Sequence, residues 1–193
     1  MASSSCTFTD ATSTVQCTAE IWYFAQATDA SSSFPAEDWQ AVITVVDSAG
    51  NSDSSSTASG VELNTLLAIH VPSSTIDYGT VAPNTDTGAV NQEVPVWNVG
   101  NASTSLKLSG TAMSSGSHTI ATSSQHYATT TFTYGGNEQV LTDVPTLVPG
   151  FSLPAPTSTA TVEGSTFWGI GVPGGTAKGT YTGVNTFEAK FEP

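Results

Sequence analysis

The chain has 193 residues, with 16 acidic residues against three lysines and no arginine, so its formal net charge is -13. So few cations cannot neutralise a run of phosphates, which excludes nucleic-acid binding, and anionic membrane surfaces would repel the chain. Helix-favouring residues are scarce, and no stretch approaches the ~20 apolar residues of a membrane span, so we expect no membrane insertion. Four tryptophans, eight phenylalanines and five tyrosines supply enough apolar surface for a folded core.

The first strand signals surround two cysteines, Cys6 and Cys17, whose spacing fits adjacent strands joined by a short turn. In a small extracellular domain two such cysteines pair, and the chain-entropy model gives a loop of this size about 3 kcal/mol of stabilisation. The alternative is two buried, reduced thiols. The polar residues after Met1 do not form a signal peptide, so we expect a mature secreted sequence.

Alternating apolar residues continue from Val15 to Ile21 and end in the cluster Trp22-Tyr23-Phe24. A β-branched run from Trp39 to Val46 predicts a second strand, which stops at a turn, Asp47-Ser-Ala-Gly-Asn51. The polar stretch 52–59 has the pattern of an edge strand. Residues 1–66 are predicted to form a small β domain, with the boundary at the apolar bridge that starts at Leu66.

Residues 67–193 carry many short strand signals separated by turns, without helical periodicity. The predicted strands are 75–78, 92–98, 104–108, 126–134, 158–162, 167–172 and 180–191. This pattern predicts an all-β antiparallel sandwich, and the proline-rich segment 141–156 predicts an extended loop or edge segment.

The N-terminal piece offers only four convincing strands, fewer than a complete sandwich needs. Three interpretations stay open: a small sheet stapled by the disulfide, a sheet packed on the second domain, or an incomplete sandwich completed by a neighbouring molecule. The third would make the protein a filament subunit that adds strands at an open sheet edge.

Three segments carry a family resemblance: Ile76-Asp-Tyr-Gly-Thr-Val81, Val94-Pro-Val-Trp-Asn-Val-Gly-Asn101 and Leu106-Lys-Leu-Ser-Gly110. They resemble Ig-like modules of bacterial and archaeal surface proteins, of the CARDB-like and major-sperm-protein-like types. The run from Trp39 to Asn51 is similar to Ig-like surface repeats. The resemblance implies tandem Ig-like β-sandwiches in a secreted or surface-displayed structural or adhesive protein, with no catalytic residues to transfer.

The residues themselves predict no enzyme. His70, His118 and His126 lie apart, each in a different predicted strand or loop, and no nucleophile elbow, zinc-protease motif, phosphate loop or dinucleotide fingerprint is present. We interpret these histidines as isolated strand or surface residues.

Calcium is the better chemical candidate, because Asp47, Asn51 and Asp53 place three oxygen-bearing side chains around one turn. The alternative is a hairpin in which these side chains satisfy backbone donors. No other cofactor is predicted.

Aromatic residues are candidates for a sugar-binding platform, namely Trp22, Tyr23, Trp39 and Trp168. An exposed aromatic strip would stack on sugar rings, whereas the alternative is core packing.

Two further sites concern modification. Asn101-Ala-Ser103 is a glycosylation sequon in a predicted turn. Lys107 is expected to face away from Leu106 and Leu108 and therefore to be exposed, which argues against an isopeptide bond.

The sequence therefore predicts a non-enzymatic extracellular structural or adhesive protein, which self-associates through sheet edges or binds other surface proteins. The alternative function is a carbohydrate-binding module with glycan partners.

Overall fold

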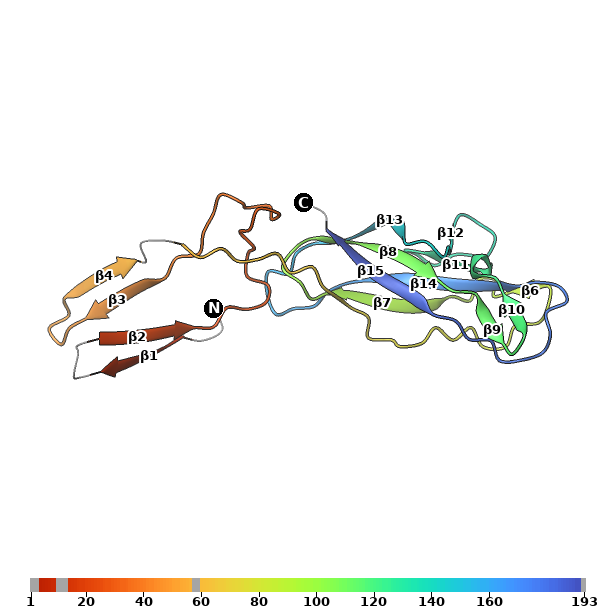
Figure 1. Ribbon diagram of the computed structural model, residues 1–193, viewed down its shortest axis with the longest axis horizontal. Helices are drawn as coiled ribbons and strands as arrows, with labels where there is room; N and C mark the ends of the chain where they lie inside the picture. The colour runs from red at the N-terminus through yellow and green to blue at the C-terminus, as the bar shows by residue number, and fades with distance from the viewer. Residues whose placement is uncertain (1–3, 10–13, 57–59, 192–193) are drawn as a thin grey trace.

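The structure, a computed structural model, describes residues 4–9, 14–56 and 60–191. Within these residues the fold is all-β, and the one helical turn is a 3-10 helix at Thr122–Ser124. No helix in this part of the chain has the length and apolar character needed to cross a membrane. The predicted fold class is confirmed as all-β, with several antiparallel sheets consistent with a β-sandwich (Figure 1).

The larger sheet of the sandwich has the order β12-β11-β14-β7-β5, and β6 pairs with the end of β14. All of these pairings are antiparallel. The strands are β5 (Ile69–His70), β6 (Thr85–Asp86), β7 (Gln92–Asn98), β11 (Gln125–Ala128), β12 (Gln139–Val140) and β14 (Val162–Val172).

The smaller sheet has the order β13-β8-β15, again antiparallel. Its strands are β8 (Thr104–Gly110), β13 (Thr146–Leu153) and β15 (Asn185–Phe191). A short hairpin, β9 (Met113–Ser115) with β10 (His118–Ile120), lies at the end of the sandwich far from the N-terminus (Figure 1).

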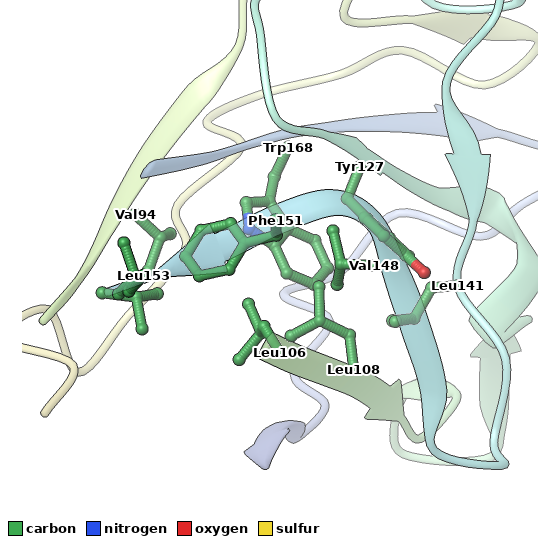
Figure 2. Packing of buried hydrophobic residues seen from close by; sticks show 10 residues of the cluster. Val94, Leu106, Leu108, Tyr127, Leu141, Val148, Phe151, Leu153 and Trp168 are labelled. Atoms are coloured by element: carbon green, nitrogen blue, oxygen red, sulfur yellow. The ribbon is translucent and has the colours of Figure 1, made fainter. Parts of the chain in front are cut away.

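The hydrophobic core lies between these two sheets (Figure 2). Along β7, Val94, Val96 and Asn98 are buried while Pro95 and Trp97 are partly exposed, as the predicted alternation requires. Trp168 and Tyr127 pack against each other in the core with ring centroids 5.5 Å apart. The remaining buried core residues are Leu106, Leu108, Leu141, Val148, Phe151 and Leu153.

The N-terminal part is built differently, as two separate hairpins that extend from one end of the sandwich (Figure 1). The first pairs β1 (Ser4–Thr9) with β2 (Thr14–Ala19), and the second pairs β3 (Val42–Val46) with β4 (Ser52–Ser56). Every residue of β3 and β4 is exposed. Tandem sandwiches are therefore not confirmed, and the division at residues 66 and 67 stays a prediction.

Several local expectations differ from the structure. The cluster Trp22-Tyr23-Phe24 follows β2 as a loop, and the predicted strand 75–78 is also a loop. The proline-rich segment 141–156, by contrast, agrees with the prediction of an edge segment, because it contains β13 at an edge of the smaller sheet. Lys107 faces away from the buried Leu106 and Leu108 as expected and is partly exposed, and its ammonium group pairs with the Glu188 carboxylate at 3.0 Å on the adjacent strand.

The core makes a stability prediction. Replacing Leu106, which is 0% exposed, with alanine should cost about 3 kcal/mol of unfolding free energy, because the cavity adds to the lost burial. Leu147→Ala, at a residue 41% exposed on β13, is the matched control and should cost no more than about 0.5 kcal/mol. Urea denaturation measures both, and equal losses would contradict this placement of the core.

Candidate functional site

The first hairpin is closed by a disulfide and has one polar face. Cys6 lies directly opposite Cys17 in the register, and the two sulfurs are bonded, which confirms the predicted disulfide. Val15 and Cys17 share a face because they are two residues apart, and Val15 is 36% exposed. Thr7 and Gln16 pair on the opposite face. The hairpin is thus amphipathic, and on its apolar face Val15 is partly exposed and Cys17 is half-buried.

The second hairpin exposes an unusual run of β-branched residues. Val42, Val45 and Val46 of β3 are 65%, 59% and 62% exposed, and their cross-strand partners on β4 are Ser56, Asp53 and Ser52. Strands with one buried face hide alternate residues, but β3 exposes apolar side chains on both faces. A two-stranded sheet of this kind is marginally stable by itself.

The turn of the second hairpin uses the residues predicted to bind calcium. The Asp47 carboxylate accepts hydrogen bonds from the backbone N–H groups of Ala49 and Asn51 at 2.8 and 2.9 Å, and from the Asn51 side-chain amide at 2.8 Å. The Asn51 side-chain and backbone donors hold the pKa of Asp47 below its ordinary value. Asp53 lies beyond this turn, on β4 opposite Val45. This geometry fits the alternative of a hydrogen-bonded turn.

No group of three potential metal-ligating side chains gathers within residues 4–9, 14–56 and 60–191. Calcium binding at Asp47, Asn51 and Asp53 stays a prediction.

The edges of the sandwich carry features that discourage strand addition. β5 and β12 are two residues long, and β13 contains Pro149 and a register shift between Leu147 and Ser152. The fourth edge strand, β15, places Glu188 and Lys190 at exposed positions. Short strands, prolines, bulges and charges are the devices by which natural proteins protect open edges.

The hairpins lack most of these devices. β1, β2 and β3 contain no charged residue and no proline, and β4 contains one charge, Asp53. Both strands of a two-stranded sheet are edges. The chain therefore protects the edges of its sandwich and leaves those of its hairpins open.

A set of polar contacts joins the loop after β2 to the segment that leads into the sandwich. Asp29 accepts hydrogen bonds from the Thr65 backbone N–H at 2.6 Å and from the Thr65 hydroxyl at 2.7 Å. Thr28 bonds to Leu63 in both directions, through its own backbone N–H and its side-chain oxygen. The two Thr65 donors hold the pKa of Asp29 below its ordinary value.

Asn101, which follows β7 in the sandwich, adds two hydrogen bonds to these contacts. We call the contacts of Thr28, Asp29 and Asn101 with residues 63–66 the junction. The Asn101 side-chain oxygen accepts the Leu66 N–H at 2.6 Å, and its side-chain nitrogen donates to the Asn64 carbonyl at 3.1 Å. Asn101 is only 8% exposed. A Cβ on the preceding residue, Gly100, would collide with the Leu66 carbonyl, so this close approach requires glycine. The predicted glycosylation acceptor is therefore a buried junction residue in the folded chain.

Beside this junction lies an open cleft of about 830 Å³. Its walls come from the loop 21–39, the turn after β7, residues 155–157 and the end of β15. Trp22 and Trp39 line it, with 41% and 36% of their surface exposed. Tyr23 is 42% exposed but does not line the cleft. Trp168 is 0% exposed and belongs to the core, so its prediction as a ligand-binding ring does not fit.

One buried polar cluster was not anticipated. His126 Nδ1 donates to Glu138 Oε1 at 2.8 Å, the Gly135 backbone N–H donates to the same oxygen, and Tyr134 stacks on the His126 ring. The Glu138 side chain is only 2% exposed. Burial tends to raise the pKa of Glu138, yet the hydrogen bonds from His126 and the backbone together hold it below its ordinary value. The residues are twelve apart on β11 and in the following loop, and no motif marks the pair.

Neither the protein-family models nor the curated proteins with which the sequence was compared match it. The resemblance to Ig-like surface modules stays a prediction.

The junction predicts a local effect of Asn101→Ala. Losing both side-chain hydrogen bonds leaves buried polar groups without partners and should lower the free energy of unfolding by about 1–3 kcal/mol. Hydrogen exchange at the Leu66 amide should accelerate. Asn101→Asp keeps the oxygen that accepts this amide but loses the donor to the Asn64 carbonyl, so exchange at Leu66 should accelerate less than in Asn101→Ala. Unchanged exchange at Leu66 in Asn101→Ala would contradict this role.

The buried cluster predicts a pH effect. Because folding lowers the pKa of Glu138 from 4.5, its stabilising contribution is complete above about pH 4.5 and is lost as the pH falls through the folded value. The Glu138→Gln variant should be less stable than the unmodified chain at pH 7 and should approach it in acid. Chemical denaturation at a series of pH values measures this difference. A gap that stays constant from pH 7 to pH 3 would overturn the prediction.

Proposed function

We propose that this chain is a non-enzymatic structural subunit of an extracellular assembly, in which copies associate through the open edges of β1–β2 and β3–β4. The observation that carries the proposal is the contrast between the two parts. The sandwich edges are short, interrupted or charged, while the hairpin edges are regular and nearly uncharged.

Pairing with a strand of a neighbouring molecule would stabilise the hairpins in two ways. Backbone N–H and C=O groups along an open edge would gain partners in a neighbouring strand. The exposed valines of β3 would at the same time lose water-exposed apolar area, worth about 25 cal/mol for each Å² buried. Each copy carries two such hairpins, so it can contact more than one neighbour, and association can continue beyond a dimer.

The distribution of charge along the chain also bears on where copies can associate. With a net charge of -13, copies of this chain repel one another at long range. β1, β2 and β3 carry no charge themselves, so the repulsion at the hairpins comes from acidic residues beside these strands, such as Asp47 and Asp53. Added salt should therefore favour assembly by screening the remaining acidic residues.

Further observations support an extracellular location and a non-enzymatic role. The disulfide between Cys6 and Cys17 is typical of oxidising, extracellular environments. The three histidines lie on three different strands, β5, β10 and β11. Serine and threonine hydroxyls and carboxylates on the exterior favour solubility of the free subunit.

The test is sedimentation velocity over a range of protein concentrations at low and high salt. The unmodified chain should form species larger than dimers as concentration and salt rise. Val45→Lys places a charge on β3 and should reduce this association at least about tenfold, since charges on an edge oppose strand addition. The matched control is Val90→Lys, at a valine 66% exposed in a loop of the sandwich, which should assemble normally.

A chain that stays monomeric at all concentrations and salt levels would overturn the proposed function. Assembly of Val45→Lys at the same concentration as the unmodified chain would show that β3 is not a contact.

A further inference from the structure

We propose that the cleft beside the junction is a binding site for an uncharged polysaccharide. The site goes beyond the proposed function, because none of its lining residues belongs to β1, β2, β3 or β4. Its volume of about 830 Å³ lies in the range typical of ligand sites, about 300–1,000 Å³.

The apolar side of the cleft is made of aromatic rings that the fold leaves open. Trp22, Phe34 and Trp39 are 41%, 44% and 36% exposed, in contrast to the fully buried Trp168 of the core. Phe24 also lines the cleft and stacks on Trp22, with planes 10° apart and centroids separated by 5.8 Å. Phe24 therefore covers one side of Trp22 and supports its ring, and the part of Trp22 that stays exposed offers a flat apolar surface to the C–H face of a sugar ring.

Hydrogen bonds hold the Trp39 ring and the loop around it in place before any ligand arrives. The indole N–H of Trp39 donates to the Gln26 carbonyl at 2.8 Å, and the Trp39 backbone exchanges two hydrogen bonds with Val61. The Gln26 side-chain amide donates to the Glu37 carboxylate at 2.6 Å. A platform fixed in this way loses little conformational entropy on binding.

The polar side of the cleft matches a ligand rich in hydroxyl groups. Side chains of Ser33, Ser103 and Thr157 line it together with the carboxylates of Glu37 and Asp38. Hydroxyls and carboxylates can accept the hydrogen bonds that sugar hydroxyls donate. No Lys, Arg or His appears in the lining within the part of the chain that the structure describes, and the net charge is -13, so acidic polysaccharides are disfavoured.

A compact organic cation is the competing ligand, since acidic and aromatic residues also attract ammonium groups. Two features favour the sugar. Trp22 and Phe24 are nearly parallel, whereas a cation is best enclosed by rings that surround it. The lining also carries the hydroxyls of Ser33, Ser103 and Thr157, which can pair with sugar hydroxyls and supply no charge to a cation.

The test uses the full chain and four neutral hexasaccharides: cellohexaose, chitohexaose, mannohexaose and maltohexaose. Isothermal titration calorimetry and tryptophan fluorescence should detect binding of at least one of them at millimolar concentration. Trp22→Ala should weaken that binding roughly tenfold, through loss of a stacking surface. Tyr23→Ala is the matched control, because Tyr23 is similarly exposed, at 42%, and lies outside the cleft.

Phe34→Ala, on the same cleft, is a second variant and should also weaken binding, and circular dichroism checks that each variant is folded. The proposal is overturned if no hexasaccharide binds, if Trp22→Ala and Tyr23→Ala bind equally, or if choline displaces the sugar. Sedimentation of the same variants separates this result from the proposed function, because assembly through the hairpins should be unchanged.

Discussion

A two-stranded sheet has no second layer on which to bury its apolar side chains, and this constraint divides the molecule. The residues that follow the junction form two stacked sheets, so that Leu106, Leu108 and Trp168 are fully buried between them (Figure 2). The hairpins before the junction have no second sheet to pack against. Their valines face water and both of their strands are edges. We therefore propose that a neighbouring molecule supplies the strands that the hairpins lack.

The junction explains how two unlike parts are joined without a shared core. Its contacts are polar and specific: Asp29 binds Thr65, while Asn101 binds the backbone on both sides of that segment. Because these groups are partly or fully withdrawn from water, breaking one contact leaves its partner unsatisfied. The same contacts fix the loop that carries Trp22 and Trp39, so the geometry of the cleft depends on the junction. The proposed assembly edges and the proposed ligand cleft are thus neighbouring but separate surfaces.

Sequence patterns predicted those features of the fold that depend on residues close together in the chain. The alternation of Val94 and Val96 with Pro95 placed one face of β7 in the core, and the spacing of the two cysteines indicated the disulfide. Contacts between distant segments had no such signal. Asn101 has the sequence of an exposed glycosylation site, yet it is buried by a segment 35 residues earlier in the chain. The sequence around Trp168 and Trp22 did not tell a core ring from an exposed one. Trp168 is buried because its strand, β14, pairs with β7 and β11 inside the sandwich.

The central claim concerns backbone groups at the hairpin edges, so amide hydrogen exchange tests it most directly. Exchange is followed for the intact chain from dilute to concentrated solution. The account predicts that amides within residues 42–56 exchange rapidly in dilute solution and become protected as concentration rises, while amides of β7 and β14 are protected throughout. Exchange in residues 42–56 and in β1–β2 that is independent of concentration would contradict the claim that copies of this chain pair through these edges.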